Sequence, residues 1–100
     1  MSDTSFVRIT PRALADLERV FNYIRQDSPQ NAATMIEKLV DTISALNILP
    51  HRFDVPRVAT VRGRQVGSMS VRPYLVRYRI DETRKAVYVL RVRHGVRRRP

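Results

Sequence analysis

The chain has 100 residues, 43% of them hydrophobic and 28% charged, which suits one globular domain and excludes a disordered or collagen-like chain. No cysteine is present, so disulfides and thiolate chemistry are excluded and the usual ligands of structural zinc are missing. The net charge is +10, and the second half alone holds 14 basic and three acidic residues, every basic one except Lys85 being arginine. Because arginine pairs bidentately with phosphate and carboxylate groups, this bias predicts a nucleic acid, an acidic protein or both as partner.

The first segment predicts a short strand that leads into an amphipathic helix. Phe6 to Thr10 alternates briefly between apolar and polar residues. Thr10 is a favoured N-cap and Pro11 a favoured first helical residue, so a helix is expected from there to about Gln26. Its apolar stripe comprises Leu14, Leu17, Phe21 and Ile24, with Ala13 and Val20 beside it, whereas Arg12, Asp16, Arg19 and Arg25 are expected outside the stripe.

A second helix is expected after the same kind of start signal, with Ser28 as N-cap and Pro29 as first helical residue. It runs for about 20 residues until Pro50 stops it. Its apolar stripe comprises Ile36, Leu39, Ile43 and Leu46. The tight connection predicts an antiparallel helical hairpin over about residues 11–49, whose wide apolar face must lie on a sheet.

Residues 51–61 lack a sustained period and contain Pro56, so an irregular connection is expected there. A three-strand region is expected over about 63–94, followed by a basic tail at 95–100. Its first strand ends near Val71, and Gly67 marks either a bulge or a close backbone approach. The predicted fold is therefore α+β in the order β-α-α-β-β-β, forming a single domain over 1–100.

The last two strands form an antiparallel hairpin around the loop 81–85. Strict alternation places Tyr74, Val76, Tyr78, Ile80, Ala86, Tyr88, Leu90 and Val92 on a core face. The opposite face then carries Leu75, Arg77, Arg79, Val87, Val89, Arg91 and Arg93. Apolar residues surrounded by charged ones are typical of a protein interface. Because the tyrosines of the hairpin are expected in the core, they are not available to stack on nucleic-acid bases.

Signals of metal binding and catalysis are sparse. His51 and His94 make no metal-ligand set, and the glycines match no phosphate-loop spacing. His51 follows Pro50 and is expected at a helix end. No metal and no cofactor are expected. The N-terminus lacks a signal-peptide layout and no run of about 18 apolar residues exists, which predicts a cytoplasmic protein without membrane contact.

Four strings of this sequence resemble the RelE/ParE superfamily of bacterial type II toxin–antitoxin toxins, most closely its ParE branch. They are ITPRALADLERVFNYI, SALNILP and the pair YLVRYRID and VYVLRVRHG. The resemblance covers nearly the whole chain and implies a helical hairpin on one face of a small, mainly antiparallel sheet. It also implies a cognate antitoxin that covers the exposed apolar and basic surface. We therefore expect the antitoxin on the face that carries Leu75, Arg77, Arg79, Val87, Val89, Arg91 and Arg93.

The resemblance leaves the target open. ParE-like members look like inhibitors of DNA gyrase that perform no chemistry, whereas RelE-like members look like ribosome-dependent mRNA endonucleases. Metal-independent RNA cleavage requires a base, an acid and a cation for the phosphorane charge. Only His94 could serve as acid or base here, with Arg72 and Arg91 as cations, so the gyrase inhibitor is preferred and the nuclease is the alternative. A toxin-derived interaction domain without toxicity is a third possibility.

Overall fold

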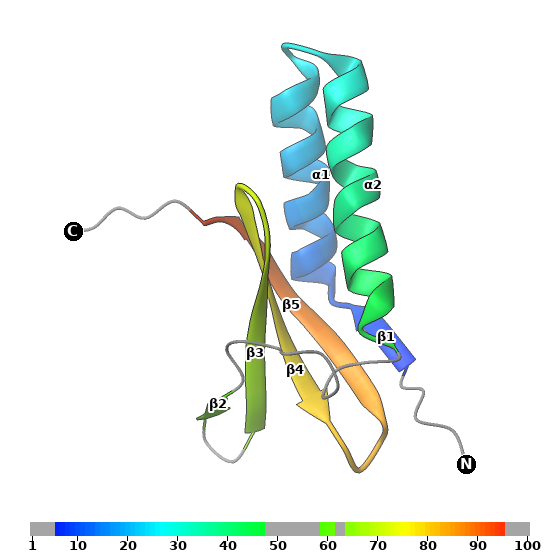
Figure 1. Cartoon of the computed structure of the whole chain (residues 1–100), viewed down its shortest axis with the longest axis vertical. Coiled ribbons are helices and arrows are strands. Elements are labelled where there is room, and N and C mark those ends of the chain that lie inside the picture. Colours follow the sequence, from blue (N-terminus) through cyan, green and yellow to red (C-terminus); the bar gives the residue numbers. More distant parts are fainter. Residues whose placement is uncertain (1–5, 48–58, 62–63, 96–100) are drawn as a thin grey trace, which may run out of the picture.

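A computed structural model describes residues 6–47, 59–61 and 64–95 of the chain. They form a mixed sheet with a helical hairpin on one face, which confirms the predicted α+β class (Figure 1). The helices are α1 (Pro11–Arg25) and α2 (Pro29–Ala45), and the strands are β1 (Phe6–Ile9), β2 (Ala59–Val61), β3 (Arg64–Val71), β4 (Tyr74–Asp81) and β5 (Ala86–His94). The strand order is β1-β5-β4-β3-β2; β1 runs parallel to β5, and the other neighbours are antiparallel.

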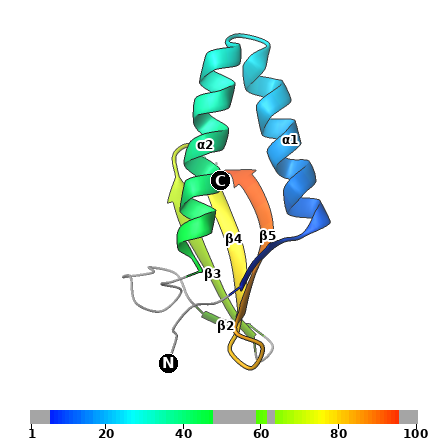
Figure 2. The same cartoon turned by 90° about the vertical axis from the view of Figure 1, so that its right-hand side faces the viewer.

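Both helices begin where the sequence predicts. The Thr10 hydroxyl accepts from the Ala13 amide at 3.2 Å and also donates to the Val89 carbonyl at 2.8 Å, which fixes the start of α1 against β5. The Ser28 hydroxyl accepts from the Asn31 amide at 3.1 Å. The helices then run antiparallel, side by side in both views (Figures 1 and 2).

The predicted end of the second helix and the predicted irregular connection both need correction. α2 stops at Ala45 rather than near Pro50, because the Leu46 amide bonds to the Ile43 and Ser44 carbonyls and tightens the last turn. Ala59–Val61, expected to be irregular, forms the short edge strand β2 against β3. His51 and the tail beyond residue 95 lie outside the described residues.

A β-bulge in the last hairpin corrects the predicted sheet faces. The β4–β5 register shifts between Arg77 and Tyr78, so that Arg77 pairs with Arg91 but Tyr78 pairs with Val89. One extra residue on β5 reverses the side-chain parity of everything before it on that strand. Val87 and Val89, expected on the exposed face, are fully buried, and Tyr88, expected in the core, is not.

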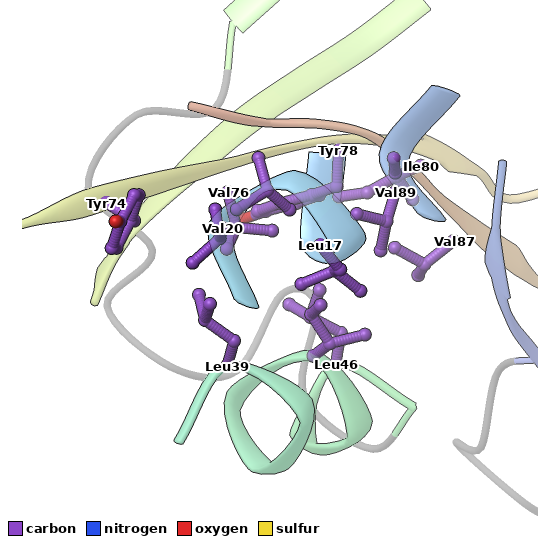
Figure 3. Packing of buried hydrophobic residues seen from close by; sticks show 13 residues of the cluster. Leu17, Val20, Leu39, Leu46, Tyr74, Val76, Tyr78, Ile80, Val87 and Val89 are labelled. Carbon is purple, nitrogen blue, oxygen red and sulfur yellow. The ribbon is translucent and has the colours of Figure 1, made fainter. Parts of the chain in front are cut away.

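The core lies between the helices and one face of the sheet (Figure 3). Its members are chiefly Leu17 and Val20 of α1, Leu39, Ile43 and Leu46 at α2, Tyr74, Val76, Tyr78 and Ile80 of β4, and Val87, Val89 and Val92 of β5. Met69 and Val71 of β3 pack against this cluster. Gly67 allows a close approach, because a Cβ there would lie 2.7 Å from the Tyr78 ring.

The stripe on α1 is rotated from the predicted one. Leu14 and Phe21 remain 51% and 37% exposed, whereas Asp16, expected outside the stripe, is only 3% exposed. Asp16 lies one turn from both Ala13 and Val20 and therefore belongs to the side of α1 that meets β5. A carboxylate thus occupies a buried position at the junction of helix and sheet.

Candidate functional site

The sheet face turned away from the helices is the first candidate surface, and we call it the helix-free face. Cross-strand register and burial place on it Phe6, Arg8, Val66, Ser68, Ser70, Leu75, Arg77, Arg79 and Tyr88, with Arg93 at its margin. Among these, Leu75 is 39% and Phe6 is 71% exposed. The surface therefore combines accessible apolar groups with several arginines, as the sequence predicts for a protein interface.

A tyrosine lies at the centre of this face. Tyr88 pairs with Arg8 on β1 and with Arg79 on β4, so three neighbouring strands place two cations beside one ring. The Arg79 guanidinium carbon lies 4.4 Å from the Tyr88 ring centroid, within the range of a cation–π interaction. The row Arg8–Tyr88–Arg79 can therefore stack on a planar group and pair with an anion at the same time.

The second candidate surface is a cleft between α1 and the ends of β4 and β5. Its volume is about 410 Å³, and its lining includes Val20, Tyr23, Tyr74, Arg93 and His94. The Tyr74 and His94 rings meet edge to face with their centroids 5.4 Å apart. This cleft brings a histidine, two tyrosines and arginine side chains together.

Asp16 anchors the inner end of the cleft. Its carboxylate accepts from Arg91 Nε at 2.8 Å, from the Val92 amide at 2.8 Å and from Arg19 at 2.9 Å. Burial by itself raises the pKa of Asp16, but these hydrogen bonds outweigh it and hold that pKa below its ordinary value. The charge of Arg91 is thus largely neutralised inside the molecule.

The predicted nuclease residues are only partly brought together. Arg91 and His94 both line the cleft, but Arg91 is bound to Asp16. Arg72 lies in the exposed turn before β4 and lines a separate hollow of about 290 Å³ with Leu75 and Gly95. Tyr74 borders both hollows.

The predicted antitoxin-binding set is also divided. Leu75, Arg77 and Arg79 belong to the helix-free face with Arg93 at its margin, while Val87 and Val89 are in the core for the reason given above. Arg91 reaches Asp16 instead of standing free. The prediction of a docking site therefore retains four of its residues in an accessible position.

Sequence reasoning missed Arg8, Tyr88 and Asp16. The first two were missed because strict alternation cannot reveal a bulge, and β1 had not been placed beside β5. The burial of Asp16 could have been predicted from helical spacing. Asp16 lies three residues after Ala13 and four before Val20, which puts it among the buried residues of α1.

The described residues lack two kinds of feature. No group of three or more His, Cys, Asp or Glu side chains in that part of the chain could hold a metal ion. No helix within the described ranges is long and apolar enough to cross a membrane.

Comparison with known proteins places the chain in a family. The family described as the ParE toxin of the type II toxin–antitoxin system, parDE, matches residues 7–99. The chain belongs to this ParE toxin family. The predicted resemblance to the RelE/ParE superfamily is thereby confirmed, and the chain is a type II toxin of that superfamily.

Relatives of this ParE-family chain carry names from both branches. It is 36% identical over 88 residues to Toxin RelE2 of Caulobacter vibrioides (strain ATCC 19089 / CIP 103742 / CB 15), covering 88% of this chain and 92% of that protein. Its fold is similar to a structure of the chromosomal ParDE system from P. aeruginosa, with a TM-score of 0.74 and 20% identity over 95% of this chain and 100% of that one. It is also similar to a structure of the toxin–antitoxin complex RelBE2 from Mycobacterium tuberculosis, with a TM-score of 0.61 and 26% identity over 91% of each chain.

Proposed function

We propose that this ParE-family toxin inhibits DNA gyrase by binding it, performs no chemistry of its own, and is neutralised by a cognate antitoxin. DNA gyrase is a cytoplasmic enzyme, so the proposed place of action is the cytoplasm. The family match supports the choice of target. The solved toxin–antitoxin complex among the similar structures supports the choice of an antitoxin as partner.

The observation that carries the proposal is the helix-free face. Arg8 and Arg79 border Tyr88 there, and Leu75 and Arg77 extend the same accessible surface along β4. A partner that presents carboxylates around apolar side chains would match this chemistry. We propose that the antitoxin covers this face through Leu75, Arg77, Arg79, Tyr88 and Arg93.

A gyrase supercoiling reaction with the purified toxin tests the first part of the proposal. We expect inhibition together with a trapped cleavage complex. The absence of both at saturating toxin would refute a gyrase target.

Co-purification with the product of the neighbouring reading frame tests the second part of the proposal. The variant Arg77→Ser/Arg79→Ser is expected to weaken that complex at least about tenfold, since each charged hydrogen bond contributes about 1.5–3 kcal/mol. Arg84→Ser serves as a matched control, because Arg84 lies in the exposed turn between β4 and β5, outside the paired strands of the sheet.

A second candidate function is ribosome-dependent mRNA cleavage. Two observations favour it, namely the similarity to a protein called Toxin RelE2 and the cleft in which His94 meets Tyr74 beside Arg93. His94 would take the proton from the attacking 2′-hydroxyl of the RNA or return one to the leaving oxygen, and Arg93 would stabilise the negative charge of the phosphorane. Translating ribosomes supplied with the toxin would then yield mRNA cut at codon positions. An unchanged cutting pattern with His94→Ala would exclude His94 from that chemistry.

A further inference from the structure

The cleft between α1 and the end of β5 has a floor and a rim of different chemistry. Val20 and Val92 are buried and line its floor together with the ring of Tyr74. Arg93 and His94 line it as exposed residues. α1 and the C-terminal part of β5 diverge (Figure 1), and residues of both line the cleft. The cleft can therefore bury an apolar group and pair with an anion next to it.

The outer edge of β5 is only partly covered. β1 pairs with β5 over Ala86–Val89 and no further. Beyond that point Asp16 accepts from the Val92 amide at 2.8 Å and so protects one position of the edge. The strand continues to His94, and its last residues run along the cleft.

The register shows which backbone groups remain on this edge. The Gly95 amide donates to the Pro73 carbonyl at 2.7 Å, so the odd-numbered residues at the end of β5 exchange hydrogen bonds with β4. Val92 and His94 consequently direct their amides and carbonyls away from β4. No described residue donates to the Val92 carbonyl or accepts from the His94 amide. One acceptor and one donor are thus placed as in an unpaired strand edge.

The charges along the cleft favour one kind of partner. The negative charge of Asp16 is satisfied by Arg91, Arg19 and the Val92 amide. Arg93 makes no ion pair with any described residue and stands at the cleft mouth with His94. The accessible charge is therefore positive, and it lies beside the unpaired strand edge.

We propose that this cleft receives an extended acidic segment of a partner protein as an additional strand on β5. The segment would bond to the Val92 carbonyl and the His94 amide, bury one aliphatic side chain against Val20 and Tyr74, and place a carboxylate beside Arg93. Strand addition supplies main-chain bonds, and alternate side chains supply specificity. The inference rests on the proposed function in taking the antitoxin as the natural source of this segment, and it adds a second docking site to the helix-free face.

A residue-resolved NMR titration tests the proposal on the full chain labelled with ¹⁵N. The probes are the peptide acetyl-Glu-Leu-Glu-Leu-Glu-amide, its counterpart with lysine in place of glutamate, and an oligouridylate. We expect the acidic peptide to shift and protect the His94 amide. We also expect it to bind at least about tenfold more tightly than the lysine peptide. The reason is that only the acidic peptide can form a charged hydrogen bond with Arg93, and the loss of one such bond weakens binding by about that factor.

Two variants outside the Asp16 network sharpen the test. Arg93→Glu is expected to reverse the preference between the acidic and the lysine peptide, and Tyr23→Ala, at a residue that is 71% exposed on the cleft wall, is expected to weaken both. Arg84→Glu in the exposed turn carries the same charge change away from the cleft and should leave binding unchanged. The amide spectrum of each variant reports whether the fold is intact.

Three results would overturn the proposal. The first is that the peptide changes only amide signals of the helix-free face. The second is equal binding of both peptides. The third is that oligouridylate alone changes the amide signals of the cleft residues. The last result would assign the cleft to nucleic acid instead. The gyrase reaction contains no antitoxin, so its outcome and the outcome of this titration are independent of each other.

Discussion

The two sides of the sheet use the same residue types for opposite purposes. Toward the helices, Asp16 of α1 binds the Arg91 guanidinium, and Tyr78 is fully buried in the core. On the helix-free face, the Arg79 guanidinium lies over the Tyr88 ring, and Tyr88 stays partly exposed between Arg8 and Arg79. The count of arginines and tyrosines therefore says little about binding. What matters is whether the partner of each side chain is already present within the chain.

The largest expected effect is on the helix-covered side. Asp16→Ala removes the acceptor of Arg91, of Arg19 and of the Val92 amide at once. Breaking a buried pair on one side costs about 3–5 kcal/mol, and partial exposure of Arg91 places this case near the lower end. Chemical denaturation should show a loss of about 3 kcal/mol in the free energy of unfolding. A loss below about 1 kcal/mol would mean that Asp16 does not hold α1 to β5.

The pH dependence of stability gives a smaller effect from the same carboxylate. The pKa of Asp16 is lowered in the folded state, so its contribution is fully present above the ordinary carboxyl pKa near 3.8 and is lost as the pH falls through the folded pKa. The stability difference between the original chain and Asp16→Asn should therefore be constant at neutral pH and shrink only below about pH 4. A difference that grew on acidification would contradict a lowered pKa.

On the helix-free face the expected effect on stability is the smallest. Arg79→Ser removes a cation–π contact at a solvent-accessible site, which contributes about 0.5–1 kcal/mol. Thermal unfolding should therefore shift little, while binding of the antitoxin falls. If Arg79→Ser destabilised the chain as much as Asp16→Ala, the two faces would not differ in the way described.

Much of the fold could be predicted because local chemistry determines it. Thr10-Pro11 and Ser28-Pro29 fix the starts of both helices, and alternation identifies β4 and β5. The end of α2 was less predictable, because the last turn tightens well before Pro50.

The candidate surfaces were harder to predict than the elements. Because of a single bulge residue, Tyr88 lies on the exposed face in place of Val87 and Val89. No local sequence pattern marks the position of the bulge. The position of β1 beside β5 brings Arg8 next to Tyr88 through a pairing of residues far apart in the sequence. The burial of Asp16 was readable from helical spacing, but its partners Arg91 and the Val92 amide depend on tertiary packing.

The central claim is that the helix-free face, and not the Asp16 network, recognises the partners of this toxin. Its most direct test compares Arg79→Ser/Tyr88→Ser with the exposed-turn control Arg84→Ser in two assays, gyrase supercoiling and antitoxin binding, after thermal unfolding has shown that both variants are folded. We predict that the double variant loses antitoxin binding and gyrase inhibition by about tenfold or more, while the control retains both. Full activity of the folded double variant in both assays would contradict the account.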